Sequence, residues 1–222
     1  MWSGTWKENR AKAQMAQSEW IIEPTDNGIR IASNLGPMLT AGFDEKEYPG
    51  SGPFANDRFK VKKIGKNDYQ IDQYRDGQHV MTERDHVTDD GRKLTRTLTT
   101  HHAKGGNTIN VFTYNRKGDQ IGSPYPYIGS WTADPTATKW GAENTIVIAQ
   151  NGDVLTWTNP VSGAVMTINV PNGQVTETGT YVPKDLTRKF NRIDDHTIEM
   201  VNTHGADGQS HQGTRFNPTG VR

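Results

Sequence analysis

The feature that most constrains the fold is a series of short, β-branched segments joined by turn sequences. The segments 20–23 and 29–31 flank Asn27-Gly28, and two similar segments flank Asn151-Gly152. An Asn-Gly pair favours a two-residue hairpin, because both positions adopt positive φ angles at low cost. Hairpins of this kind join neighbouring antiparallel strands, so we predict antiparallel sheets in both halves of the chain.

Strand signals of the same kind continue at nearly even spacing. The segment 109–114 (Ile-Asn-Val-Phe-Thr-Tyr), for example, alternates between two faces as a strand does. Evenly spaced short strands are typical of a barrel or a sandwich, so we expect an all-β fold of antiparallel, barrel-type units. The other strands are predicted at 58–64, 68–74, 79–87, 93–102, 108–115, 145–149, 154–157, 165–170, 175–181, 188–193, 197–202 and 211–216.

The composition agrees with a thin core. Hydrophobic residues make up 32% of the chain, but six Trp, seven Tyr and six Phe are spread along its whole length. Antiparallel sheets with one face in water need few apolar residues, and aromatic side chains supply much of the buried area. Only the segment 7–18 is rich in good helix formers, and we expect it to form a short helix or turn that plugs a barrel end.

The two halves of the chain resemble each other. Gly4-Thr5-Trp6 matches Gly129-Ser130-Trp131, and the strand around 20–22 matches the one at 145–148. Other matching pairs follow in the same order, which argues for a duplication. The second half has no counterpart of the hairpin predicted at 93–115. We therefore predict a first barrel unit at 1–116, a linker at 117–126 whose Gly and Pro residues interrupt the strands, and a second, shorter unit at 127–222.

Several functional classes find no support in the sequence. Lys and Arg together number 25, as do Asp and Glu, and no basic block stands out, so a nucleic-acid partner is not expected. No apolar run approaches the roughly 20 residues of a membrane-spanning helix. The chain has no Cys, which excludes disulfides and thiolate chemistry. Phosphate-binding, dinucleotide-binding and zinc-protease motifs are absent, and neither a cofactor nor a metal is predicted.

The opening residues Ser3-Gly4-Thr5-Trp6-Lys7-x-Asn9-x-Ala11-Lys12 resemble the start of mature, exported bacterial proteins with a lipocalin-like fold, which typically begin G-T-W-K-L-N-x-A-K-S. The likeness continues through 48–52, the strand at 58–64 and the Asp90-Gly91-Arg92 turn. It covers about 2–116 and, more weakly, 127–217. This chain departs from the pattern at Glu8, at Ala13 and in having a second unit.

The resemblance implies a barrel fold and export to the periplasm or outside the cell, with the signal peptide removed. A cytosolic protein with a tightly packed N-terminus would begin in the same way. The resemblance also implies that Trp6 and Trp131 each close one end of a barrel. It carries over no catalytic residues, because members of the group are mostly uncharacterised.

Histidines are the first candidates for chemistry. His101 and His102 are adjacent, and neighbouring residues of a strand point to opposite faces, so only one of them can face a barrel interior. Asp85 and His86 lie on the strand before. A His set with a carboxylate could transfer protons or bind a metal ion, although exposed His at polar strand ends is the simpler interpretation.

Arginine and aromatic residues are the candidates for ligand binding. Arg84 or Arg96, if it points inward, could pair with a carboxylate, and we assign Arg84 to the ligand site. Surface ion pairs between strands explain the same pattern. Aromatic residues are expected near a barrel cavity, and some of them would instead belong to the core. These aromatic candidates are Tyr69, Tyr74, Phe112, Tyr114, Trp157 and Tyr181.

We therefore expect a small-molecule binding protein that holds an apolar or aromatic ligand in a barrel cavity or between the two halves. The alternative is a lipocalin-like enzyme, such as a hydrolase, lyase or isomerase, that uses His and carboxylate acid–base chemistry. A structural or protein–protein role is a third hypothesis. A carboxyl or His with a perturbed pKa in a closed site would favour the enzyme. The sequence does not predict an oligomeric state.

Overall fold

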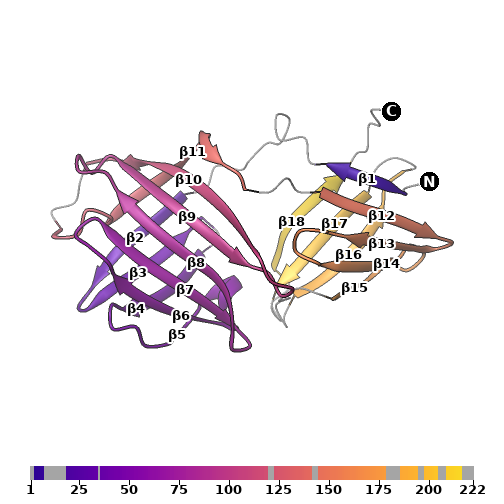
Figure 1. The fold of residues 1–222 in the computed structure, drawn as a ribbon, viewed down its shortest axis with the longest axis horizontal. Helices are drawn as coiled ribbons and strands as arrows, with labels where there is room; N and C mark the ends of the chain where they lie inside the picture. The colour runs from indigo at the N-terminus through magenta and orange to yellow at the C-terminus, as the bar shows by residue number, and fades with distance from the viewer. Residues whose placement is uncertain are drawn as a thin grey trace. The chain divides into compact units, whose positions relative to one another are not determined.

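The fold was analysed in a computed structural model of the chain. The structure describes residues 3–7, 19–34, 36–119, 123–141, 145–178, 186–194, 198–204 and 209–216. Within these ranges the regular structure is antiparallel β-strands and one short 3₁₀ helix, η1 (Gly52–Phe54). The strands form two sheets, one nearly closed into a barrel and one curved into a half-barrel (Figure 1). The expected all-β, antiparallel, barrel-type fold is confirmed.

The ten-stranded sheet closes on itself almost completely. The strand at one edge, β4 (Gly36–Gly42), bridges to the segment that follows β5 (Tyr48–Pro49) at the other edge: Leu39 pairs with Gly50, and the Ser51 amide donates to the Met38 carbonyl at 2.7 Å. In sheet order the strands are β4 (Gly36–Gly42), β3 (Gly28–Ser33), β2 (Glu19–Thr25), β11 (Gly129–Lys139), β10 (Asn107–Lys117), β9 (Lys93–His101), β8 (Gln78–Val87), β7 (Asp68–Arg75), β6 (Asp57–Lys63) and β5 (Tyr48–Pro49).

The eight-stranded sheet is the half-barrel. Its described core is a smaller cluster that includes Leu155, Trp157, Ile168 and Phe190. In sheet order the strands are β1 (Gly4–Lys7), β12 (Thr145–Asn151), β13 (Val154–Thr158), β14 (Val165–Asn169), β15 (Gln174–Thr178), β16 (Leu186–Arg192), β17 (Ile198–His204) and β18 (Gln209–Phe216).

The chain divides into compact units at places other than the predicted linker. One unit comprises Asn9–Ala142, and the other comprises Met1–Glu8 together with Glu143–Arg222. The difference arises because β11, which follows the predicted linker, pairs with β2 and β10. In the same way β1, at the start of the chain, pairs with β12. Each unit thus takes one strand from the other half of the sequence.

One end of the barrel is sealed by aromatic side chains. Tyr127 is fully buried and meets the ring of Tyr69 edge to face at 4.8 Å, and its carbonyl accepts from Trp131 Nε1 at 2.9 Å. The Arg116 guanidinium lies 4.1 Å from the Trp131 ring and donates to the Ile128 carbonyl at 2.8 Å. These contacts place Trp131 in the core at the sealed end of the barrel.

Most of the strand predictions agree with the structure to within a few residues. The hairpins predicted at Asn27-Gly28 and Asn151-Gly152 both form, but only Gly152 has a positive φ, of 57°, so the expected backbone angles are wrong at the other three residues. Positive φ angles at both turn residues occur instead in the hairpin between β7 and β8, at Asp76 and Gly77, of 48° and 76°. Strands β1, β4, β5 and β11 were not predicted as strands, because β1 has only four residues and Pro and Gly residues interrupt the periodicity of the other three. The helix predicted at 7–18 falls outside the described residues except for Lys7, which belongs to β1.

Candidate functional site

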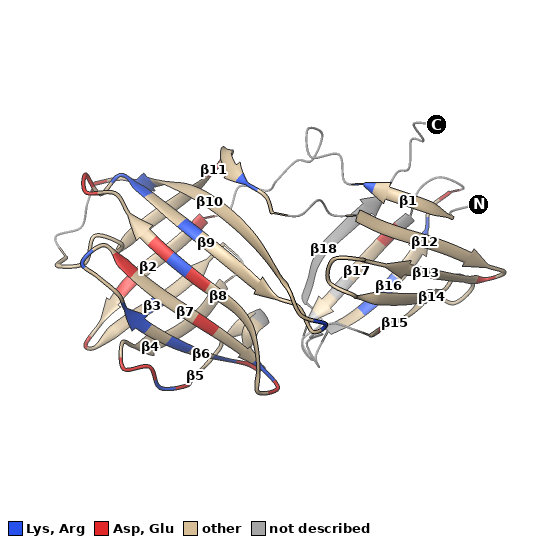
Figure 2. Ribbon diagram, viewed as in Figure 1, with Lys and Arg blue, Asp and Glu red and all other residues tan. Residues whose placement is uncertain are grey.

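A charged cluster lies inside the ten-stranded barrel. The register pairs Asp85 of β8 with Arg96 of β9, and Glu83 with Leu98. Because side chains alternate along a strand, Glu83, Asp85 and Arg96 share the inward face. These three residues are only 2%, 1% and 2% exposed, respectively. Figure 2 shows the acidic and basic segments side by side on β8 and β9.

The centre of the cluster is a bidentate ion pair. Arg96 Nε lies 2.9 Å from Asp85 Oδ1, and Arg96 Nη2 lies 2.7 Å from Asp85 Oδ2. The Tyr69 hydroxyl also donates to Asp85, at 2.5 Å. Two aromatic rings flank the guanidinium, Trp20 at 4.1 Å and Tyr114 at 5.4 Å. Hydrogen bonds and cation–π contacts thus compensate the buried charge of Arg96.

Glu83 is the unusual member of the cluster. Burial raises its pKa to about 8, the Arg96 charge opposes this rise, and the neighbouring Asp85 adds to it. Glu83 is therefore protonated at neutral pH, and the Arg96, Asp85 and Glu83 side chains together carry no net charge. A protonated carboxyl in a dry site can donate a hydrogen bond or a proton, which an ionised one cannot.

Three buried polar atoms around this guanidinium lack a hydrogen bond among the described residues. They are Arg96 Nη1, Glu83 Oε1 and Trp20 Nε1. Two of the three atoms still have a polar group nearby: Glu83 Oε1 lies 3.1 Å from Arg96 Nη2, and the Trp20 side chain interacts with the Tyr114 hydroxyl. Arg96 Nη1 is therefore the atom that most clearly lacks a partner among the described residues. Buried polar groups in folded proteins are nearly always satisfied, so the unpartnered Nη1 of Arg96 marks a place where another molecule can bind.

The inward face is less buried toward one end of the barrel. Leu94 and Tyr114, on the sealed side of the cluster, are buried. Leu98, Thr100 and Asn110, which alternation places on the same inward face beyond Arg96, are only half-buried. These inward side chains therefore keep partial contact with solvent at the end of the barrel that carries the β9–β10 turn.

The structure brings together some of the predicted ligand residues. Tyr69 and Tyr114 flank the buried ion pair, and Phe112 is the cross-strand partner of Arg96. Arg84 lies outside, where its Nε donates to Gln70 Oε1 at 3.0 Å. Tyr74 also lies outside and stacks on a histidine.

The remaining two predicted ligand residues lie apart from the cluster. Trp157 is buried in the core of the half-barrel, and Tyr181 lies outside the described residues.

The predicted catalytic histidines do not join Asp85. His86 points outward to Asp68, at 2.7 Å, and its cross-strand partner Thr95 precedes His101 by six positions, roughly 20 Å along a strand. His101 also lies outside, where its ring is 4.4 Å from that of His79.

His102 takes the inward side at the half-buried end of the barrel and bonds Thr108 Oγ1 at 2.7 Å. Of the four predicted catalytic residues, only Asp85 therefore belongs to the buried cluster.

Sequence reasoning missed Glu83 and Trp20 and preferred Arg84 to Arg96. A signal for the correct face is present in the alternation, because Arg96 stands between Leu94 and Leu98 in phase with both. Asp85 is likewise in phase with the buried Val87, whereas Arg84 is in phase with residues of the outer face. A charge in phase with core residues is a sign that the charge is buried.

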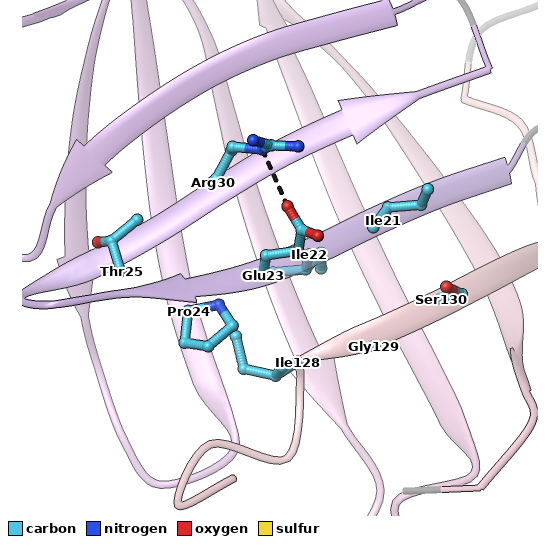
Figure 3. Close-up of a pocket in the computed structure, with 9 residues that line it drawn as sticks. All are labelled: Ile21, Ile22, Glu23, Pro24, Thr25, Arg30, Ile128, Gly129 and Ser130. Carbon is cyan, nitrogen blue, oxygen red and sulfur yellow. Dashed lines mark ion pairs between the residues drawn. The ribbon is translucent and has the colours of Figure 1, made fainter. Parts of the chain in front are cut away.

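A separate depression of about 560 Å³ lies over β2, β3 and the start of β11. Its exposed lining includes Ile21 and the surface ion pair between Arg30 and Glu23, at 2.9 Å (Figure 3). An exposed pair of this kind contributes at most about 1 kcal/mol. The depression offers no buried polar group, so it is a weaker candidate than the cluster around Arg96.

The chain matches no protein-family model, no curated protein and no solved structure. The likeness to exported lipocalin-like proteins therefore stays a prediction from the sequence motifs described above. Across the described ranges, no three His or acidic side chains are grouped as ligands of a metal ion. The same residues include no helix that is both long and apolar enough to cross a membrane.

Proposed function

We propose that the ten-stranded barrel binds a small, largely apolar molecule through one neutral polar group that meets Arg96, Glu83 and Trp20. The observation that carries this proposal is the unsatisfied Nη1 of the buried Arg96, beside Glu83 and Trp20. The half-buried inward face beyond Arg96 supplies the path of entry and the contacts for the apolar part of the ligand. Small barrels commonly hold one small ligand in this way.

The charge of the cluster selects the ligand class. Asp85 already compensates Arg96, and Glu83 is protonated at neutral pH because burial raises its pKa to about 8. A ligand carboxylate would therefore bring an uncompensated charge into a dry site, at a cost of several kcal/mol. A ketone, amide or ester oxygen accepts from the same donors without that cost, so we propose a neutral carbonyl compound.

The first test uses prodan, a neutral aromatic ketone whose emission depends on polarity. It should bind saturably and shift to the blue, and anilinonaphthalene sulfonate, which carries a negative charge, should bind at least tenfold more weakly. Leu98→Trp, which fills the inward face, should reduce prodan affinity more than tenfold. Thr97→Trp is the matched control, because its side chain points outward from the same strand, and it should bind as the wild type does.

The pH dependence of binding provides a second test. As pH rises through about 8, Glu83 loses the proton that it donates and gains a charge, so prodan affinity should fall. Glu83→Gln keeps a neutral donor at this position and should bind prodan with an affinity independent of pH between 6 and 9. In the first test, equal prodan affinity of the Leu98→Trp and Thr97→Trp variants, or no prodan binding by the wild type, would refute the proposal.

An enzymatic role is the second candidate, and it rests on Glu83. A carboxyl that stays protonated at neutral pH beside an ion-paired Asp85 has the arrangement of a general acid. Glu83 would give its proton to the carbonyl oxygen of a bound compound, which is the part of a general acid in an isomerase or a hydrolase. Glu83→Gln would then retain prodan binding and lose turnover, whereas a pure binding protein shows no turnover to lose. Membership of the lipocalin-like exported group, and export itself, are proposed on the sequence resemblance alone, which is carried by residues 3–12 and continues over about 2–116.

A further inference from the structure

The first strands of the two repeats are equivalent in structure. Gly4 and Gly129, which begin the two G-x-W segments, both have positive φ angles, of 157° and 142°. Both strands continue into a Trp two residues later, and both form the neighbour of a strand that enters an Asn-Gly hairpin. A shared rare backbone angle at the same motif position supports the duplication predicted from the sequence.

The strands that accept them are equivalent as well. In the barrel, Gly129, Ser130 and Trp131 pair with Ile22, Ile21 and Trp20. In the half-barrel, Gly4, Thr5 and Trp6 pair with Ile148, Val147 and Ile146. The register is identical in the two sheets, and β2 and β12 also show the same order of exposed and buried residues.

Each of these first strands, β1 and β11, nevertheless pairs with a strand of the other repeat. By sequence order β1 belongs to the repeat that contains β2, but it pairs with β12. Strand β11 belongs to the repeat that contains β12, but it pairs with β2. Each acceptor therefore binds a first strand from the other repeat, which is strand exchange within one chain.

The two donor strands differ in how firmly they are held. Strand β11 has eleven residues, is hydrogen-bonded to strands on both of its edges and buries Trp131 completely. Strand β1 has four residues, of which only Trp6 is even partly buried. A short strand with little buried area opens at a small free-energy cost, so β1 is the strand that can leave and be replaced.

We propose that β1 is an exchangeable strand and that a second copy of this chain donates its own β1 to β12. The incoming strand makes the same hydrogen bonds in the same register, so the contacts themselves do not favour either arrangement. Because the chain's own β1 is covalently linked to β12, it competes with an effective concentration on the order of mM. Reciprocal exchange in a closed dimer should therefore appear when chains refold together near or above that concentration.

The absence of Cys makes a disulfide test simple. Thr5 and Val147 are paired and exposed, so Thr5→Cys combined with Val147→Cys in one chain should give a monomeric disulfide. Thr5→Cys combined with Ile21→Cys, which would report pairing within the first repeat, should stay reduced. The opposite result, a disulfide in the second variant and not in the first, overturns the exchange.

Exchange between copies is tested with two single variants. Chains with Thr5→Cys and chains with Val147→Cys, unfolded together in urea and refolded near 1 mM, should give a disulfide-linked dimer. Chains folded separately and then mixed at low concentration should give at least tenfold less. Val154→Cys in place of Val147→Cys is the control, because it is equally exposed but lies on β13, away from β1. Equal dimer yields with the two partners, or no dimer at all, would overturn the proposal.

Discussion

The nearly closed barrel and the half-barrel differ in how deeply they bury an arginine–carboxylate ion pair. In the barrel, the side chains of Arg96 and Asp85 are 3% and 0% exposed. In the half-barrel, the comparable pair of Arg188 and Glu177 keeps 23% and 12% of its side chains exposed. The barrel contains the β9–β10 hairpin, which supplies Arg96, and the described residues of the half-barrel include no counterpart of it. The comparison indicates that closing the sheet creates the dry interior that a buried polar site requires.

Core packing follows the same division. The barrel core combines residues from nearly every one of its strands with Tyr127 and Ile128 from the loop before β11. The described core of the half-barrel is smaller and draws on β12, β13, β14, β16 and β17. A smaller core leaves less buried area to stabilise the unit, so mutations at equivalent positions should cost more in the barrel.

Removing the buried arginine should give the largest effect. Arg96→Met leaves Asp85 ionised and unpaired in a dry site and should lower the free energy of unfolding of the barrel by about 3–5 kcal/mol. Arg188→Met should lower that of the half-barrel by about 1 kcal/mol, because water still reaches its partner. Amide hydrogen exchange with mass spectrometry can follow each unit separately. Arg84→Met, on the outer face, is the control, and equal losses at Arg96 and Arg188 would contradict the comparison.

Replacing the tryptophans of the two G-x-W segments should also destabilise the barrel more than the half-barrel. Trp131→Ala removes a fully buried ring together with the surface on which Arg116 stacks, and should cost about 3–5 kcal/mol. Trp6→Ala removes a ring that is only partly buried and should cost about half as much. Hydrogen exchange in β2 and β12 measures the two losses, and a larger loss at Trp6 would show that the half-barrel depends more on its first strand.

Changing pH should affect the barrel through Glu83. Between pH 4.5 and about 8 the folded barrel keeps a proton on Glu83 that the unfolded chain has released. The free energy of unfolding should therefore fall as pH rises through this window, by a few kcal/mol at most. Glu83→Gln should remove the slope and be the more stable protein at pH 9, as urea unfolding at several pH values would measure. An unchanged slope in the variant would assign the pH effect to another group.

The smallest effect is expected at the glycines. Gly129→Ala forces a side chain into a positive-φ position and against the Arg116 guanidinium, and should cost about 1–3 kcal/mol. Gly4→Ala, whose added carbon would meet only the Trp6 ring at ordinary contact distance, should cost about 1 kcal/mol. Thermal unfolding of the two variants gives this comparison. Equal shifts in Tm would mean that the Arg116 contact adjusts without strain.

Several parts of the candidate site were accessible from the sequence. Asp85, Tyr69 and Tyr114 were predicted separately as functional residues, and the structure places all three around Arg96. The choice of Arg84 as the inward arginine follows from a weakness of alternation, which gives the period of a strand but not its phase. Where both faces carry polar residues, as in β8, only the in-phase neighbours of a charge indicate which face is buried.

The sequence by itself determined the all-β class, the hairpins and the equivalence of the two G-x-W segments, because turn chemistry and strand alternation act between residues that are close in the chain. Only the tertiary structure decided that β1 pairs with β12 and β11 with β2. Both repeats offer the same strand and the same acceptor in the same register, so no local preference distinguishes the exchanged pairing from the unexchanged one. That choice depends on how the whole chain packs, as does the burial of Arg96, which requires β8, β9 and β2 to enclose a common interior.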